Sequence, residues 1–353
     1  MRQNILEYTP DQLETYFREI GEPKFRVKQL WKGIYSGNYI DFSQFSTFPN
    51  SLREKLDADF YLRAFTLLET IQSELDDTTK FLWELTDGYK IESVIIYEGK
   101  RVTFCISSQV GCPLDCKFCA TGKMGLLRNL SHSEIVEQVF QMKALSKFPP
   151  TNIVFMGMGE PMLNYEQVIR AANILSEPEG LAFSRKKITI STSGVIKGIR
   201  QMADDNSPFS LAISLNATDQ PTRERIMPIA KKYPLDELLK TARYYTEKLG
   251  KRITFEFVLM EGINTTDEHA HELIKLTKGI PCRINIIPCN SDDPEYSPPS
   301  QEVLEHFDRL VNKNNRTVTI RSRKGWEIQA ACGQLYAANE KKSIKKLKST
   351  LKL

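Results

Sequence analysis

The sequence lacks the features of a membrane or secreted protein. No stretch approaches the roughly 18 consecutive apolar residues of a membrane-spanning helix. The first residues, Met1 to Asn4, do not form the apolar segment of a signal peptide. Cysteine is scarce, and its 7 residues are unevenly spaced, unlike a secreted disulfide framework. We therefore expect a cytoplasmic protein with reduced thiols and no membrane partner.

Most of the chain also lacks an excess of basic charge. The net charge is +4, but residues 341–353 alone contain six lysines and no acidic residue. The rest of the chain therefore carries slightly more acid than base, and the basicity belongs to a C-terminal tail. Such a tail either aids solubility as a solvated end or contacts RNA phosphates.

Three of the few cysteines lie close together, at Cys112, Cys116 and Cys119. A zinc ribbon usually has two separated Cys-x2-Cys pairs, and the sequence has no second pair. An iron–sulfur cluster held by three cysteines keeps one iron free for a substrate or cofactor. The spacing therefore favours a catalytic cluster. A zinc site completed by His132 or by a distant cysteine, or three unrelated buried thiols, stay open as alternatives.

The first part of the chain has helical and then strand-like patterns. Thr9 and Gln12 fit a capping box, and helices are expected at 25–35 and 52–60. Basic residues on the first of these helices either contact RNA or lie on the solvent-exposed face of the helix. Strand-like runs with turn signals follow at 65–71, 81–84 and 91–96. We expect an accessory region at 1–97, a core at 98–336 and a basic tail at 337–353.

From about Arg101 onward, strands alternate with helices, which predicts parallel βα units. In a parallel barrel, functional groups lie at the carboxyl ends of the strands. The cysteine loop, Gly159, Ser191, Ser214 and Asn290 all fall at such ends, so we expect one site there. The expected strands are 102–107, 153–157, 187–192, 209–215, 253–259, 283–288 and 317–321, and the expected helices are 131–146, 165–175, 196–203, 235–249, 267–277 and 300–312.

Four stretches together resemble the RlmN and Cfr family of radical S-adenosylmethionine RNA methyltransferases. They are Phe104–Cys112, Cys119–Gly122, Met156–Pro161 and Ala330–Leu335. The resemblance runs from about Arg26 to Tyr336. It implies an α/β fold: a partial (βα)6 radical SAM barrel with an N-terminal helical and β-ribbon accessory domain. It also implies two cofactors, a 4Fe-4S cluster and S-adenosylmethionine.

The resemblance assigns roles to individual residues. The carrier cysteine, Cys332, would take a methyl group and then form a covalent protein–RNA intermediate. Cys105 would release the product by forming a disulfide with Cys332, and Glu92 would remove the ring proton. Relatives usually have His where this chain has Asn216. The cluster ligands would be Cys112, Cys116 and Cys119, and the contacts to S-adenosylmethionine would be Gly159, Glu160, Ser191, Ser214, Leu215, Asn216 and Asn290.

The implied activity is formation of 2-methyladenosine in 23S ribosomal RNA, at the peptidyl transferase centre, and in transfer RNA next to the anticodon. The implied partners are these RNAs and an electron donor such as a flavodoxin, and we expect a monomer. One alternative is the Cfr-like branch, which methylates carbon 8. Pro161 favours carbon 2, whereas the pair Arg321 and Ser322 is closer to the Cfr-like branch. An alternative of another class is a noncatalytic, zinc-dependent RNA-binding protein.

Overall fold

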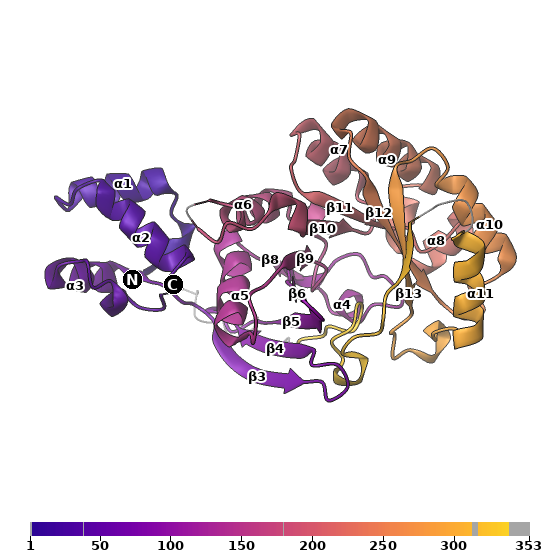
Figure 1. Ribbon diagram of the computed structural model, residues 1–353, viewed down its shortest axis with the longest axis horizontal. Helices are drawn as coiled ribbons and strands as arrows, with labels where there is room; N and C mark the ends of the chain where they lie inside the picture. The colour runs from indigo at the N-terminus through magenta and orange to yellow at the C-terminus, as the bar shows by residue number, and fades with distance from the viewer. Residues whose placement is uncertain (1, 38, 179, 313–316, 339–353) are drawn as a thin grey trace, which may run out of the picture.

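The computed structural model describes residues 2–37, 39–178, 180–312 and 317–338. The lysines of the predicted basic tail lie outside these ranges. Among the helices described, none is both long enough and apolar enough to cross a membrane. Figure 1 shows an elongated molecule in which a small helical part stands beside a larger α/β part.

The helices of the N-terminal part are α1 (Pro10–Glu19), α2 (Phe25–Tyr35) and α3 (Asn50–Asp59). The predicted capping box is present, because Thr9 and Gln12 exchange hydrogen bonds of 2.8 and 3.2 Å at the start of α1. Two short parallel strands, β1 (Gln3–Asn4) and β2 (Phe60–Tyr61), bring the beginning and end of this part together.

An antiparallel ribbon follows, made of β3 (Thr66–Gln72), β4 (Thr79–Glu84) and β5 (Lys90–Glu98). Its last strand pairs antiparallel with β6 (Arg101–Cys105), and the pair includes Val94 opposite Cys105. The ribbon therefore continues directly into the sheet of the barrel.

The parallel strands of the barrel are β6, β9 (Asn152–Phe155), β10 (Ile188–Thr192), β11 (Ser210–Ser214), β12 (Ile253–Leu259) and β13 (Cys282–Pro288). A short strand, β14 (Val318–Ile320), adds in parallel to β13. The whole sheet has the order β14-β13-β12-β11-β10-β9-β6-β5-β4-β3. The predicted α/β class and partial (βα)6 barrel are confirmed.

Helices after the strands cover the outside of the barrel (Figure 1). A capping box of Ser131 and Glu134 begins α5, at the start of the helix expected at 131–146. The predicted helices at 165–175 and 235–249 have the observed bounds, and the short α4 and α8 were not predicted. The helices are α4 (Ala120–Lys123), α5 (His132–Leu145), α6 (Tyr165–Leu175), α7 (Ile196–Asp204), α8 (Gln220–Ile226), α9 (Leu235–Leu249), α10 (Asp267–Leu276) and α11 (Gln301–Val311).

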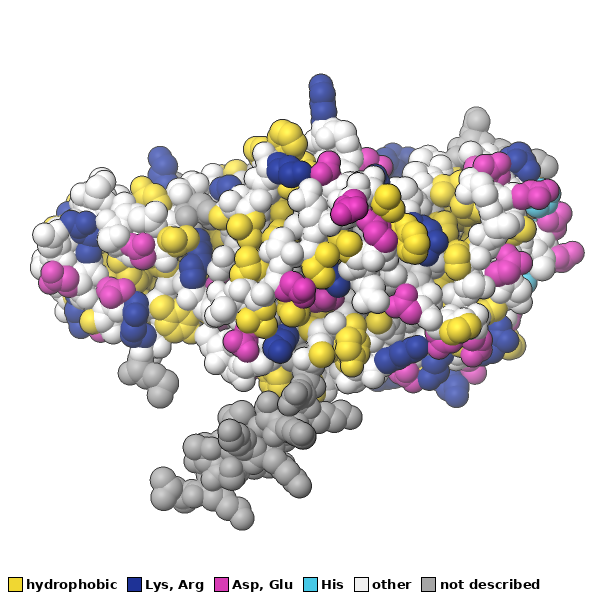
Figure 2. Space-filling model, turned by 90° about the horizontal axis from the view of Figure 1, so that it is seen from below, with side chains coloured by type: hydrophobic (Ala, Val, Ile, Leu, Met, Phe, Trp, Pro, Cys, Tyr) yellow, Lys and Arg dark blue, Asp and Glu magenta, His cyan; other side chains and the backbone are white. Residues whose placement is uncertain are grey.

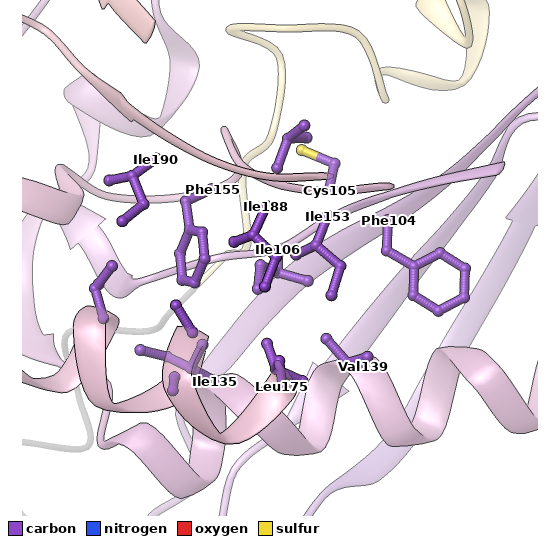
Figure 3. Close-up of a cluster of buried hydrophobic side chains, with 14 of the residues drawn as sticks. Phe104, Cys105, Ile106, Ile135, Val139, Ile153, Phe155, Leu175, Ile188 and Ile190 are labelled. Carbon is purple, nitrogen blue, oxygen red and sulfur yellow. The ribbon is translucent and has the colours of Figure 1, made fainter. Parts of the chain in front are cut away.

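A hydrophobic core fills the space between the first barrel strands and helices α5 and α6. In Figure 3 the side chains of Phe104, Ile106 and Ile153 point toward this helix layer. Cys105 lies between Phe104 and Ile106, and its sulfur points to the opposite side of the strand. The alternation of side chains along β6 thus turns the Cys105 thiol toward the barrel interior.

A buried carboxylate joins the N-terminal part to the barrel. Glu137 of α5 accepts hydrogen bonds from the backbone N–H groups of Ala64 and Phe65, at 2.6 and 2.8 Å. The guanidinium of Arg63 lies 4.8 Å from the ring centre of Phe140, on the same helix. These contacts fix the point at which the ribbon leaves the helical part.

Candidate functional site

A short hairpin holds the loop with three cysteines. Its strands are β7 (Gln109–Cys112) and β8 (Gly125–Asn129), and it was not predicted from the sequence. Gly111 has a φ of +78°, and a Cβ at this position would lie 1.9 Å from the carbonyl oxygen of Gly125. Only glycine lets the two strands approach this closely just before the first cysteine.

The three cysteines line one cavity at the carboxyl ends of the barrel strands. Burial raises the pKa of each thiol, to about 12 for Cys112. Thiols in this setting ionise only when a cation compensates the charge, as iron does when it binds thiolates. In the part of the chain that is described, no three His, Cys, Asp or Glu side chains converge on a single metal ion. A cluster does not need such convergence, because each thiolate binds its own iron.

The turn after β9 borders the same cavity and carries a buried carboxylate. Gly159 has a φ of +102°, and a Cβ there would lie 2.6 Å from the Cβ of Gln109. Glu160 accepts from the backbone N–H groups of Met162 and Ser193, at 3.0 and 2.8 Å. Burial raises the pKa of Glu160. This carboxylate is placed to accept a hydrogen bond from an ammonium group in the cavity.

Polar side chains at the ends of other strands face the same space. Ser191, Ser214 and Asn290, which were expected at strand ends, line the cavity, and so does Asn216, which the family resemblance implied. Asn216 has a left-handed backbone, with a φ of 58°, and its Oδ1 accepts from the Val258 N–H at 2.9 Å.

Leu215, unlike these four residues, does not line the cavity in the described part of the chain. It is fully buried, and its backbone N–H donates to the Glu256 carbonyl at 2.9 Å. Its own carbonyl accepts from Arg223 at 3.1 Å.

The segment that carries Cys332 closes the cavity from one side. The backbone N–H of Ala120, next to the cysteine loop, donates to the Gly333 carbonyl at 2.7 Å, and Thr121 Oγ1 donates to the Leu335 carbonyl at 2.6 Å. Asn290 Nδ2 donates to the carbonyl of Cys332 at 3.4 Å. Cys332 is exposed and lines the cavity together with the three loop cysteines. The structure thus brings the predicted carrier cysteine to the predicted cluster and cofactor site.

Cys105 and Cys332 meet at a second cavity, inside the barrel. Both line it, whereas Cys105 is not among the described residues that line the cysteine-loop cavity. Burial, and then negative charge on Cys332, raises the pKa of Cys105 to about 12. Although part of the Cys332 residue is exposed, the atoms packed around its thiol raise its pKa by desolvation, and the Arg321 guanidinium opposes that rise. Arg321 lies 3.8 Å from Glu256, so this cation is held between the two cavities.

Glu92 lies beneath the Cys332 segment. It forms a buried ion pair of 3.1 Å with Lys80, and its Oε2 accepts from the Tyr336 N–H at 2.8 Å. Burial raises the pKa of Glu92, and Lys80 opposes that rise. Among the described residues that line either cavity, Glu92 is absent. In this structure Glu92 anchors the segment rather than facing the open space.

Two protein-family models match this chain. The radical SAM superfamily model matches residues 106–276, and the ribosomal RNA large subunit methyltransferase N-terminal domain model matches residues 3–62. The probable dual-specificity RNA methyltransferase RlmN of Fervidobacterium nodosum is 40% identical over 348 residues, covering 97% of this chain and 100% of that protein. The chain belongs to the RlmN family.

Further similarities agree with the RlmN assignment. The dual-specificity RNA methyltransferase RlmN of Syntrophobacter fumaroxidans is 40% identical over 336 residues, which cover 94% of this chain and 98% of that protein. The crystal structure of a radical SAM methyltransferase from Sphaerobacter thermophilus has 36% identity and a TM-score of 0.91, and it covers 95% of this chain and all of that one.

The residues of this RlmN-family chain fit the cofactors of the family, a 4Fe-4S cluster and S-adenosylmethionine. One cavity is bordered by the three loop thiols, an acceptor carboxylate at Glu160 and polar strand ends. The predicted cofactors are therefore confirmed at the level of the family, and the assignment favours an enzyme over a noncatalytic zinc protein.

Sequence reasoning missed several charged residues of this RlmN-family site. Glu256 could have been recognised from the sequence, because it is the single charged residue in the mainly apolar strand at residues 253–259. Lys80, in a ribbon strand, had no comparable signal, and neither did Arg223. Arg321 was noted in the sequence for its likeness, together with Ser322, to the Cfr-like branch, and the structure pairs it with Glu256.

Proposed function

We propose that this RlmN-family chain methylates carbon 2 of adenine in 23S ribosomal RNA, at the peptidyl transferase centre, and in transfer RNA next to the anticodon. The observation that supports this proposal is the position of Cys332, which borders both the cofactor cavity and the cavity that contains Cys105. A methyl carrier must reach a methyl donor on one side and an acceptor on the other. The relatives are named dual-specificity RNA methyltransferases RlmN, which favours the RlmN branch over the Cfr-like branch.

A covalent carrier is needed because carbon 2 of adenine is electrophilic and cannot attack a sulfonium methyl group directly. The Cys332 thiolate would attack the methyl group of S-adenosylmethionine and become a thioether, while the methyl–sulfonium bond breaks and S-adenosylhomocysteine leaves. When bound, the cluster and S-adenosylmethionine supply the methyl group and the radical chemistry that activates it. The activated carbon then joins Cys332 to carbon 2 of the adenine.

The chain's own residues complete the reaction. Glu92 takes the proton from carbon 2, which requires the Cys332 segment to move, since the Tyr336 N–H now occupies that carboxylate. The Cys105 thiolate attacks the sulfur of Cys332 and forms a disulfide; the carbon–sulfur bond breaks, and the departing carbon takes up a proton to become the methyl group of the released base. A thiol reductant then restores both cysteines.

The cofactor contacts follow from the cavity lining. Glu160 accepts from the ammonium group of S-adenosylmethionine, and Gly159 lets the backbone approach it closely. The remaining contacts come from Ser191, Ser214, Asn216 and Asn290. Leu215 supports this set from behind through its backbone bonds to Glu256 and Arg223. An electron donor of the flavodoxin type reduces the cluster, and the chain acts as a monomer.

The deciding experiment is anaerobic incubation of iron-reconstituted protein with S-adenosylmethionine, a reductant and unmodified 23S ribosomal RNA. Mass spectrometry of the digested nucleosides then locates the new methyl group. We expect 2-methyladenosine together with 5′-deoxyadenosine. Formation of 8-methyladenosine would instead place the chain in the Cfr-like branch. A parallel reaction with unmodified transfer RNA tests the second substrate.

A further inference from the structure

The second cavity opens at the amino ends of the barrel strands, opposite the cysteine loop. The inward-facing side chains of successive strands line it, including Thr103 of β6, Asn152 of β9 and Thr189 of β10. Thr254 and Asn285, from β12 and β13, continue the lining. Hydroxyl and amide groups of this kind both donate and accept hydrogen bonds, as the edges of a nucleobase require.

The two cavities meet at the carrier cysteine. Cys332, Arg321 and Glu256 line both of them. Cys105 and Thr189 border only the second, among the described lining residues. A cofactor in the first cavity and an acceptor in the second would therefore reach the Cys332 sulfur from opposite sides.

The mouth of the second cavity is basic. Two acidic residues also line this cavity: Glu256, which is held by Arg321 and Asn285, and Glu98. Within the described ranges, no ion pair neutralises any of the basic side chains that we assign to the mouth. These side chains are Lys100, Arg101, Lys186, Lys187, Arg283 and Lys324.

Two other parts of the described surface are less suited to a polyanion. On the face shown in Figure 2, basic, acidic and apolar side chains are interspersed. The cleft between α2 and α6 contains Lys28 and Arg170, but four acidic residues share its lining and oppose binding of phosphates. These acids are Glu14, Glu166, Glu177 and Asp205.

We infer that RNA enters this chain through the amino end of the barrel, with phosphates on the basic mouth and one unstacked adenine inserted through the polar interior toward Cys332 and Cys105. This inference rests on the proposed function. A base stacked inside a helix cannot reach a sulfur that lies within the barrel cavity, so the segment that binds must be single-stranded, as in a loop or bulge. Neither the cofactor nor the RNA then needs to leave for the other to reach the carrier.

The first test removes charge from the mouth. The double variant Lys187→Gln/Arg283→Gln is compared with Lys240→Gln/Lys275→Gln, which removes the same charge from outer helices α9 and α10. Binding of a labelled, unmodified 23S ribosomal RNA fragment is titrated at several salt concentrations. We expect the mouth variant to bind about tenfold more weakly, and its salt slope to fall by about 0.7 for each lost phosphate contact. Equal effects in the two variants would overturn the inference.

The second test blocks the interior. Thr189→Phe places a ring in the second cavity, and Thr189→Val leaves the space open while removing the hydroxyl. We expect Thr189→Phe to lose RNA methylation while Cys332 is still methylated, because Thr189 does not border the cofactor cavity. Mass spectrometry of the intact protein and of the RNA measures the two methyl groups. Full RNA methylation by Thr189→Phe would show that the base takes another route.

The two tests separate failure of this inference from failure of the proposed function. If the unaltered chain methylates no RNA, the proposed function fails, and the binding titration alone still decides whether the mouth holds RNA. If the unaltered chain methylates RNA and the mouth and interior variants do so equally well, only the route is wrong.

Discussion

Glu92 and Tyr336 are joined by a hydrogen bond of 2.8 Å, from the backbone N–H of Tyr336 to the carboxylate of Glu92. The bond ties ribbon strand β5 to the segment that carries Cys332. The ribbon holds this segment at other points too, since Asp76 accepts from the Gly325 N–H at 2.9 Å and Lys80 donates to the Gln329 carbonyl at 3.4 Å. The ribbon therefore serves as a frame for the carrier segment as well as an extension of the sheet.

Replacing Glu92 separates its structural role from its proposed role as a base. Glu92→Ala leaves Lys80 buried without its partner, which costs about 3–5 kcal/mol in the free energy of unfolding. The double variant Lys80→Met/Glu92→Leu removes both charges and should recover most of that stability. Neither variant should methylate RNA if Glu92 is the base. Thermal unfolding and nucleoside analysis measure the two effects, and RNA methylation by the stable double variant would exclude Glu92 as the base.

Replacing Cys105 should trap the covalent intermediate. Cys105→Ala removes the thiol that attacks Cys332, so a protein–RNA adduct should accumulate and turnover should stop after one cycle. Cys289→Ala is the matched control, because Cys289 is another buried cysteine but does not line either cavity in the described part of the chain. Denaturing gel electrophoresis of labelled RNA measures the adduct. Normal turnover by Cys105→Ala would contradict the two-cysteine scheme.

The pH dependence of adduct resolution follows from the thiol of Cys105. Burial raises its pKa to about 12, above its ordinary value of 9.0. At pH 7 to 9 the thiol is therefore mostly protonated, and the reactive thiolate fraction grows about tenfold with each pH unit. The single-turnover rate of adduct decay should rise by up to the same factor. A rate that is constant over this range would mean that Cys105 is not the attacking group.

The order of the elements could be predicted because it depends on local signals. Helix α6 begins and ends where predicted, and α5, capped by Ser131 and Glu134, begins within one residue of its predicted start. The contacts of the site could not be predicted, because they depend on strand register and on distant pairs. Lys80 and Glu92 are diagonal neighbours across β4 and β5, and that pairing is set only when the register is fixed.

Gly159 provides a test of the cofactor cavity. In Gly159→Ala, the new Cβ would collide with the side chain of Gln109, whose Oε1 accepts from the Glu160 N–H at 2.8 Å. Glu160 should then be displaced, and the affinity for S-adenosylmethionine should fall at least about tenfold, as expected for losing a charge-assisted hydrogen bond. Gly262→Ala is the control, because Gly262 also has a positive φ, of 69°, but a Cβ there meets no atom within 4 Å. Calorimetric titration with the cofactor distinguishes the two, and equal affinities would contradict the placement of Glu160.

Arg223 is a buried cation behind the cysteine loop. It donates to the carbonyls of Leu215, Ser193 and Ser214, at 3.1, 2.8 and 3.3 Å, and thus ties the ends of β10 and β11 together. Burial lowers the pKa of Arg223 to about 10, and the nearby Cys116 opposes that change. A fixed positive charge beside a cluster ligand stabilises the more negative, reduced state of a cluster.

Arg223→Leu should therefore change both stability and redox behaviour. Each buried carbonyl left without a donor costs about 1–3 kcal/mol, so the free energy of unfolding should fall clearly. The midpoint potential of the reconstituted cluster should become more negative, whereas Arg223→Lys keeps the charge and should shift it less. Thermal unfolding and a potentiometric titration followed by electron paramagnetic resonance measure these quantities. If Arg223→Leu and Arg223→Lys lose stability equally but keep the potential of the unaltered chain, Arg223 acts only as a structural tie between the strands.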